Sequence, residues 1–194
     1  HSTRNSNMTH NSLANSYLRR AQGSALAQLA LIALGVVLLA VSSKVQVPFW
    51  PVPMTLQTAV VLLIGASYGA RLAGATLASY IAAGAAGLPV FAKGAGLAYM
   101  AGPTGGYLVG FCLAAVVMGW LTDKGFGRTI VAALGLMLIG QVLIFGFGVA
   151  WLAVLIGTEK AVAVGLVSFI PAEVLKTALA AALLGAGWSF ANKR

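Results

Sequence analysis

Charged side chains are scarce in this sequence: only 8% of its 194 residues are Asp, Glu, Lys or Arg, and only three of these are acidic. An average soluble domain carries about 25% charged residues, because its surface faces water. Here hydrophobic residues make up 60% of the chain, and the mean hydropathy is +0.94. This composition excludes a soluble globular protein and predicts an integral membrane protein whose main solvent is the lipid bilayer.

Metal ligands and nucleophiles are equally few. Cys112 is the only cysteine and lies inside an apolar run, so it can build neither a disulfide framework nor a Cys/His metal cluster. The two histidines, His1 and His10, both lie in the polar N-terminal stretch. The apolar segments contain no HExxH pattern and no Ser/His or Cys/His pair. We therefore predict no metal site, no cofactor and no catalytic residues.

Nucleotide and nucleic-acid sites are also missing. The sequence has no GxxxxGK[ST] motif, so it does not bind ATP in the manner of a P-loop protein. Its net charge is +9, but the basic residues are scattered between apolar segments and form no stripe with interleaved aromatics. We read this charge as a determinant of membrane topology rather than as a nucleic-acid interface. No repeated filter sequence, as a conductive pore would need, is present either.

The apolar segments predict an all-α membrane protein with about six transmembrane helices, since about 20 apolar residues cross a bilayer. These segments are 25–43, 55–70, 72–88, 104–121, 130–157 and 161–190. The second and third are short and are separated only by a tight turn around Gly69 and Arg71. A bundle of five helices is therefore the competing interpretation.

The predicted domain organisation follows from these boundaries. We expect one transmembrane domain over residues 25–190, preceded by a cytoplasmic segment at 8–24 and followed by a cytoplasmic tail at 191–194. Residues 1–7 are polar and precede Met8, so they are expected to be a remnant of recombinant expression.

Basic residues in the connections predict the orientation. One side would carry Arg19, Arg20, Arg71, Lys124, Arg128, Lys193 and Arg194, and the other Lys44, Lys93 and Lys160. Because the side richer in Lys and Arg is usually cytoplasmic, both termini are predicted to lie inside the cell.

Glu173 and Lys176 are the only charged residues within the predicted spans. A charge at membrane depth costs a few kcal/mol or more, so such residues are by default candidates for a functional site. Their i, i+3 spacing places them on one helical face, where each can neutralise the other. Pro171 suits the first turn of a helix, and the last segment is expected to be kinked or broken there. The alternative is a purely structural ion pair.

Four uncharged polar side chains are expected at a similar depth: Gln57, Tyr80, Tyr107 and Gln141. Together with the charged pair they would line a cavity that opens toward the outside. Each also has a structural alternative, because glutamines can bond neighbouring helices and a tyrosine can anchor a helix at the membrane interface.

Two connections on the predicted outer side are unusual. Residues 46–54 hold three prolines together with Phe49 and Trp50, so they cannot be helical throughout and would suit a stiff lid. Residues 89–103 hold Lys93 among glycines, whose backbone N–H groups can approach a ligand closely. This stretch could equally be only a flexible turn.

The same regions resemble a known family. The strings VPFWPVPMTLQT (47–58), GLPVFAKGAG (87–96), GPTGGYLVGF (102–111) and FIPAEVLK (169–176) are similar to BioY. This family comprises the biotin-specific substrate-capture subunits of energy-coupling-factor (ECF) transporters. The resemblance implies a six-helix subunit of the prokaryotic plasma membrane with a biotin pocket open to the outside. It also implies a transmembrane coupling subunit and cytoplasmic ATPases as partners, and no enzymatic activity.

The resemblance also implies roles for individual residues. Glu173 and Lys176 match the acid and lysine that hold the ureido ring of biotin, which offers N–H donors and a carbonyl acceptor. Lys93 would pair with the carboxylate of biotin, and Phe49 and Trp50 would pack on its rings. Small residues near the start of the first helix, Ala21 and Ala25, are candidates for docking the coupling subunit, and packing within the bundle is the favoured alternative for them. One departure is Ala172-Glu173, where the family pattern leads us to expect Gly-Asp.

Two other functional classes are compatible with the sequence. The chain could be a stand-alone carrier or channel for another small solute, with Glu173 as a proton relay. It could also be a structural or assembly subunit of the membrane that binds no ligand.

Overall fold

The computed structural model describes residues 24–191. The predictions for Ala21, for the N-terminal segments and for the tail after Ala191 lie outside these residues. The long helices are α2 (Ala25–Lys44), α3 (Gln57–Ala85), α5 (Gly105–Asp123), α6 (Ile130–Ile156) and α8 (Ile170–Ala191). The short elements are β1 (Gln46–Val47), β2 (Met54–Thr55), α4 (Leu97–Met100), α7 (Thr158–Gly165) and the 3-10 turn η1 (Val167–Phe169).

The helices expose apolar side chains because lipid, rather than water, surrounds them. On α2, for example, Leu29, Val37 and Val41 are all more than half exposed. Within the described residues, 5 stretches are long and apolar enough to cross a membrane, and α7, η1 and α8 together form the last of them. The predicted all-α multi-pass membrane protein is therefore confirmed, with five spans by this criterion where about six were predicted.

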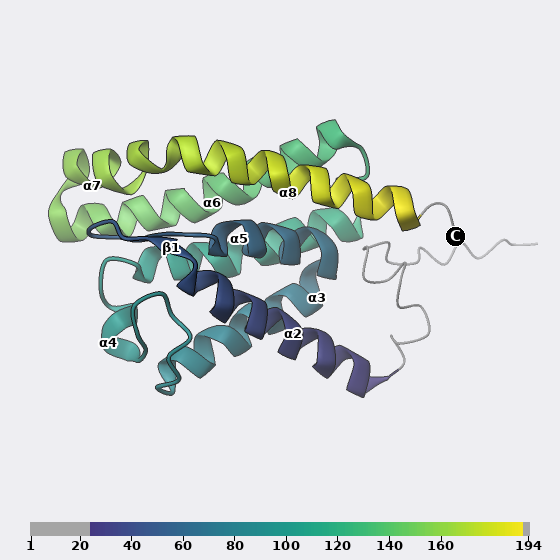
Figure 1. Ribbon diagram of the computed structural model, residues 1–194, viewed down its shortest axis with the longest axis horizontal. Coiled ribbons are helices and arrows are strands. Elements are labelled where there is room, and N and C mark those ends of the chain that lie inside the picture. Colours follow the sequence, from purple (N-terminus) through teal and green to yellow (C-terminus); the bar gives the residue numbers. More distant parts are fainter. Residues whose placement is uncertain (1–23, 192–194) are drawn as a thin grey trace, which may run out of the picture.

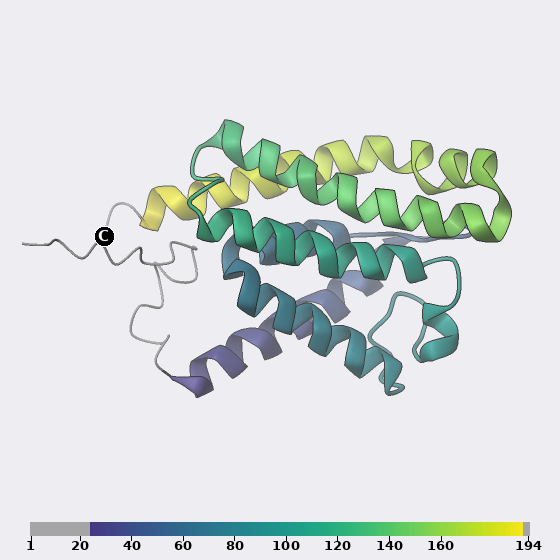
Figure 2. The same ribbon diagram turned by 180° about the vertical axis from the view of Figure 1, so that it is seen from behind.

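The difference in the number of spans comes from α3, which bends sharply at Gly69. This residue has φ 79° and ψ 165°, a backbone conformation that glycine adopts without strain. The predicted second and third spans are the two halves of α3, and the chain changes direction between them (Figures 1 and 2). The N–H of Ala70 donates to Asp123 Oδ2 at 3.0 Å, which fixes the turn against the end of α5.

The last predicted span, 161–190, is interrupted near the expected position. Helix α7 ends at Gly165, and Leu166 has φ −131° and ψ −64°, which is not helical. After η1, Pro171 lies in the first turn of α8, where its missing N–H costs nothing. The break places Glu173 close to the beginning of α8 rather than in the middle of a long helix.

The proline-rich stretch forms a hairpin, in agreement with the prediction that it is not helical throughout. Strands β1 and β2 are antiparallel, with Gln46 opposite Thr55 and Val47 opposite Met54. This hairpin lies at the same end of the bundle as α4 and α7 (Figure 1). We call this end the pocket end, because the pocket described in the next subsection opens there.

The basic residues between 24 and 191 divide between the two ends of the bundle as the sequence predicts. Lys44 ends α2 and Lys160 belongs to α7, so both lie at the pocket end, as does Lys93 in the loop before α4. Arg71 follows the turn in α3, and the connection between α5 and α6, which carries Lys124 and Arg128, lies at the opposite end (Figure 1). That the opposite end faces the cytoplasm stays a prediction.

Candidate ligand-binding pocket

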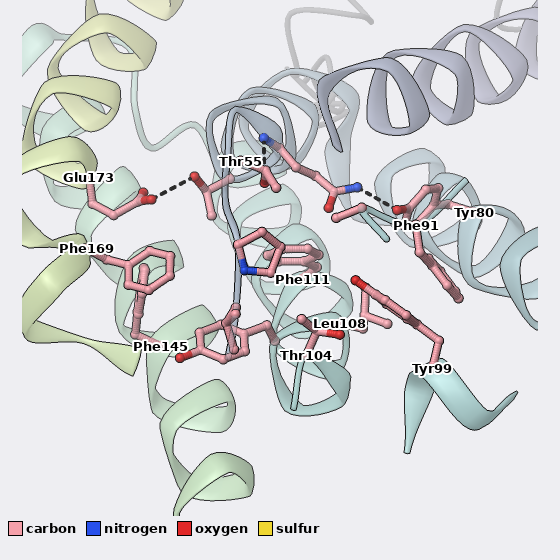
Figure 3. A pocket seen from close by; sticks show the side chains of 16 residues that line it. Thr55, Tyr80, Phe91, Tyr99, Thr104, Leu108, Phe111, Phe145, Phe169 and Glu173 are labelled. Atoms are coloured by element: carbon pink, nitrogen blue, oxygen red, sulfur yellow. Dashed lines mark hydrogen bonds between the residues drawn. The ribbon is translucent and has the colours of Figure 1, made fainter. Parts of the chain in front are cut away.

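A pocket opens inside the pocket end of the bundle (Figure 3). The empty space among its lining residues, including the part open to solvent, is about 470 Å³. The lining side chains are mainly apolar, and the largest group is aromatic: Tyr80, Phe91, Tyr99, Tyr107, Phe111, Phe145 and Phe169. The polar ones are Thr55, Gln57, Thr58, Thr104 and Glu173. An apolar pocket with a few polar groups is the usual form of a site that orients a small ligand.

Six of these aromatic side chains form two groups. In one, the rings of Phe145 and Phe169 lie 5.7 Å apart, and Tyr107 meets Phe145 edge-on at 5.7 Å. In the other, Phe91 stacks on Tyr99 at 5.1 Å and meets Tyr80 edge-on at 5.5 Å. Such ring pairs hold one another in place, so each group offers a preformed apolar surface to a ligand.

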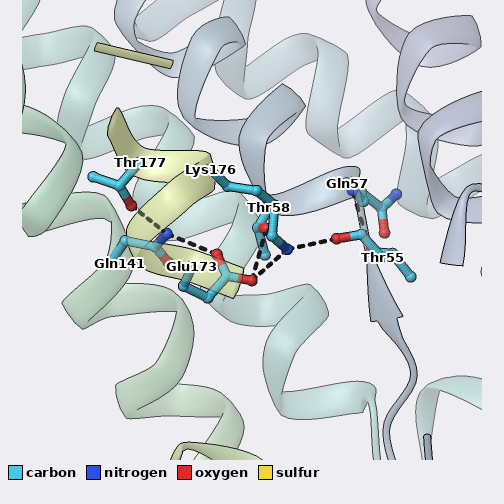
Figure 4. A network of polar contacts seen from close by, with 7 residues as sticks. All are labelled: Thr55, Gln57, Thr58, Gln141, Glu173, Lys176 and Thr177. Atoms are coloured by element: carbon cyan, nitrogen blue, oxygen red, sulfur yellow. Dashed lines mark hydrogen bonds and ion pairs between the residues drawn. The ribbon is translucent and has the colours of Figure 1, made fainter. Parts of the chain in front are cut away.

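The charged pair lies at the polar side of the pocket (Figure 4). Lys176 Nζ lies 2.5 Å from Glu173 Oε1, and the two side chains are only 13% and 9% exposed. The ammonium also donates to the carbonyl oxygen of Thr55 at 2.7 Å and to Thr58 Oγ1 at 2.9 Å. Its three donors are thus all used, which is how a buried cation is stabilised away from water.

The carboxylate is satisfied from two further helices. Thr58 Oγ1 on α3 donates to Glu173 Oε1 at 3.1 Å, and Gln141 Nε2 on α6 donates to Glu173 Oε2 at 2.8 Å. The same Gln141 nitrogen lies 2.9 Å from Thr177 Oγ1. Glu173 is therefore held by neighbours on α3, α6 and α8, and its position does not depend on a ligand.

A second set of hydrogen bonds, in the wall of the pocket, links α2, α3 and the loop before α4. Gln57 Nε2 donates to the carbonyl oxygen of Leu39 at 3.1 Å and to the Tyr80 hydroxyl at 2.7 Å. Tyr80 in turn donates to the carbonyl oxygen of Val90 at 2.8 Å. These bonds tie the wall that contains Phe91 to two helices.

The structure brings together most of the residues that the sequence singles out. Glu173, Gln57, Tyr80 and Tyr107 line the pocket. Lys176 and Gln141 lie behind the lining and bond Glu173 directly. Phe49 packs edge-on against Phe169 at 6.0 Å. Tyr107 also donates to the carbonyl oxygen of Gly165 at 2.6 Å, so it fixes the end of α7 as well as lining the pocket.

Three predicted residues lie away from the pocket. Lys93 is exposed, and Phe91 and Ala92 form the wall beside it. Trp50 is 73% exposed in the turn of the hairpin. Ala25, the candidate for partner docking, is exposed at the start of α2, at the opposite end. Binding roles for these residues stay predictions, and neither Lys93 nor Trp50 contributes to the lining described above.

Several lining residues are absent from the sequence-based set. Phe111, Phe145 and Phe169 each lie four positions from a predicted polar residue, namely Tyr107, Gln141 and Glu173. Residues four apart share a helical face, so this spacing was a usable signal.

Thr58 was also missed. Its hydroxyl lies between the two charged residues, and it directly follows Gln57 in the sequence. Successive helical residues point to different sides, so nothing in the sequence indicates that both would line one pocket.

Comparison with known proteins agrees with this architecture. The model of the BioY family matches residues 9–193. A probable biotin transporter BioY from Pyrococcus horikoshii is 36% identical over 154 residues, which cover 79% of this chain and 91% of that protein. The biotin transporter BioY of Rhizobium etli is 37% identical over 166 residues, covering 80% and 88% of the two chains.

A solved structure shares the fold. The crystal structure of the S-component for biotin from an ECF-type ABC transporter superposes with a TM-score of 0.75 over 85% of this chain and 92% of that chain, at 21% sequence identity. The family model spans nearly the whole sequence, and the relatives are matched over most of their length. This chain belongs to the BioY family.

Proposed function

We propose that this protein binds biotin in the pocket described above and serves as the substrate-capture subunit of an ECF-type transporter. The observation that carries the proposal is the position of Glu173 and Thr58 at one side of a pocket whose other walls are mainly apolar, with Lys176 bonded to both from behind the lining. Biotin has the matching shape, with a polar urea at one end of an apolar bicyclic ring and an aliphatic chain.

The urea and the polar side of the pocket are chemically complementary. A urea N–H can donate to the Glu173 carboxylate, and its carbonyl can accept from Lys176 or from the Thr58 hydroxyl. All three side chains are already hydrogen-bonded to one another, so binding would exchange these bonds for bonds to the ligand. Glu173 is longer by one methylene than the aspartate expected here, and its three-sided support from α3, α6 and α8 would fix where that longer side chain ends.

The names of the relatives support the same ligand and the same partners. The Pyrococcus protein is named a probable biotin transporter and the Rhizobium protein a biotin transporter, and the structural neighbour is an S-component for biotin from an ECF-type ABC transporter. The sequence contains no P-loop motif, so ATP-driven release of biotin would require separate ATPase subunits together with a transmembrane coupling subunit.

Direct binding tests the ligand assignment. Purified protein in lipid nanodiscs should bind biotin, and Glu173→Gln or Lys176→Met should weaken binding by at least tenfold, since each change leaves a buried partner unpaired. Glu159→Gln and Lys160→Met are matched controls, because these residues are exposed in α7 at the same end of the bundle. Undiminished affinity in both site variants would reject this pocket as the biotin site.

Uptake experiments test the role of partners. Vesicles that contain this chain with a coupling subunit and ATPases should accumulate biotin only when ATP is present inside. Accumulation by the chain alone, driven by a proton gradient and indifferent to ATP, would instead favour a stand-alone carrier.

A further inference from the structure

The orientation of the Gln57 side-chain amide is set by its neighbours. Gln57 is only 4% exposed, and one end of its amide faces the carbonyl oxygen of Leu39 at 3.1 Å. A carbonyl oxygen can only accept a hydrogen bond, so the NH₂ group of the amide must lie at this end. The same nitrogen faces the Tyr80 hydroxyl at 2.7 Å.

The Tyr80 hydroxyl has a fixed direction for the same reason. Its single proton is donated to the carbonyl oxygen of Val90 at 2.8 Å, so its oxygen is free to accept from Gln57. The Tyr80 side chain is fully buried and packs edge-on against Phe91 at 5.5 Å, so it has little freedom to turn away. The Leu39 carbonyl directly, and the Val90 carbonyl through Tyr80, thus determine which end of the Gln57 amide carries the NH₂ group and which the oxygen.

The remaining polar atom, Gln57 Oε1, is left as an acceptor. It receives no hydrogen bond from any residue between 24 and 191. Unlike Gln141 Oε1, it is not sealed inside the protein. Because Gln57 lines the pocket and is otherwise buried, its accessible oxygen faces the pocket.

Gln57 and Glu173 lie on different sides of the polar region, with Thr58 and Lys176 between them (Figure 4). In the view of Figure 3, Tyr80 and Glu173 likewise lie across the pocket from each other. Along this wall, the acceptor Gln57 is therefore followed by the donors Thr58 and Lys176 and then by a second acceptor, Glu173. A cyclic urea has the complementary order of N–H, carbonyl and N–H.

We propose that Tyr80 is a positioning residue, which holds Gln57 Oε1 as the acceptor for the second N–H of the ligand's urea while Glu173 accepts the first. The carbonyl of the urea then points toward Thr58 and Lys176. This inference rests on the proposed function. It adds Gln57 Oε1 to the site as a second acceptor. It also explains how the Tyr80 hydroxyl can affect recognition of the urea without touching it.

The test measures affinity for biotin and for two analogues, each methylated on one of the two urea nitrogens. Tyr80→Phe keeps the ring but removes the hydroxyl, so the Gln57 amide keeps only its bond to the Leu39 carbonyl and its oxygen is no longer held in place for the ligand. Biotin affinity should fall about tenfold, the usual effect of losing one such hydrogen bond. The analogue methylated at the nitrogen facing Gln57 has no proton to donate there, so the same substitution should change its affinity less than threefold.

Two further variants separate this effect from a structural one. Gln57→Met should give the same selective loss, and the double variant should be no weaker than either single one, because both remove the same bond. Tyr68→Phe is the matched control, since Tyr68 also lies on α3 and donates to the carbonyl oxygen of Leu31 at 2.9 Å, far from the pocket. It should leave all three affinities unchanged.

The outcomes are distinguishable. Equal losses for all three ligands in Tyr80→Phe, or no loss for biotin, would overturn the positioning role while leaving biotin as the ligand. If the unaltered protein bound no biotin, the proposed function would fail, and the urea assignment with it.

Discussion

Gln141 donates a hydrogen bond from α6 to Glu173 on α8, with 2.8 Å between Nε2 and Oε2. This contact makes the acid of the ion pair part of a network across helices rather than a local i, i+3 pair. A neutral amide stabilises the second carboxylate oxygen without adding a charge, so the net charge of the Glu173–Lys176 pair stays zero. The network also fixes the carboxylate from the side opposite Lys176 and Thr58.

Replacing Gln141 should therefore weaken both the fold and the site. Gln141→Leu leaves Glu173 Oε2 without its donor, which costs about 1–3 kcal/mol for a buried polar group. We expect a lower unfolding temperature in detergent and about tenfold weaker biotin binding. Gln141→Glu should be worse on both measures, because it adds a like charge beside the carboxylate. An unchanged affinity in Gln141→Leu would mean that Glu173 needs no support from α6.

The charged pair Glu173–Lys176 could be predicted from the sequence, because the free-energy cost of placing charges in a membrane depends on the residue types and on their depth. Their i, i+3 spacing and the nearby Pro171 were enough to expect a site at the start of a helix. The partners that satisfy the pair could not be predicted. Thr58 lies 115 positions from Glu173, and only the packing of α3 against α8 brings their hydroxyl and carboxylate together.

The turn at Gly69 was likewise predicted in position but not in its cause. A short apolar segment followed by Gly69 and Arg71 predicted a boundary between two spans, and the structure places a non-helical glycine there. Secondary structure alone gives one helix, Gln57–Ala85, because the hydrogen-bonded turns continue on both sides. The close approach of Asp123, which makes glycine necessary, depends on tertiary packing and has no sequence signal.

Gly69→Ala should strongly destabilise the protein. Gly69 has a φ of 79°, which an alanine adopts only with strain, and a Cβ there would lie 2.5 Å from Asp123 Oδ1. We expect a loss of at least about 1–2 kcal/mol, measured as a lower thermal unfolding midpoint. Gly135→Ala is the control, because a Cβ at this position in α6 meets nothing within 4 Å. Gly135→Ala should be neutral or stabilising, and similar losses in both variants would contradict the explanation.

Thr58→Val should separate the hydroxyl from the shape of the side chain. It removes the bonds to Lys176 Nζ and Glu173 Oε1, whose lengths are 2.9 and 3.1 Å, and replaces the hydroxyl by a methyl group. Biotin affinity should fall by at least about tenfold, since a lost hydrogen bond to a charged group costs about 1.5 kcal/mol or more. Thr58→Ser keeps the hydroxyl and should bind within twofold of the unaltered protein. The interpretation fails if Ser and Val variants lose equal affinity, because the missing methyl group would then explain both.

Phe169→Ala tests whether the aromatic wall holds the apolar part of the ligand. The ring of Phe169 contacts Phe145 at 5.7 Å and Phe49 at 6.0 Å, so it lines the pocket and also supports the hairpin. Removing it should weaken biotin binding by at least tenfold, because about 1.5–3 kcal/mol of apolar burial is lost. Phe190→Ala, at the far end of α8 and 66% exposed, should leave binding unchanged.

A conservative variant distinguishes the two roles of Phe169. Phe169→Leu fills much of the same volume but cannot make the edge-on ring contacts, which are worth about 0.5–1.5 kcal/mol beyond area. If Phe169 acts mainly as an apolar wall, Phe169→Leu should recover most of the affinity lost in Phe169→Ala. If the rings mainly fix the hairpin through Phe49, the Leu variant should bind as weakly as the Ala variant, and cleavage by protease in the turn at 48–53 should become faster in both. Calorimetry of biotin binding together with limited proteolysis decides between these outcomes.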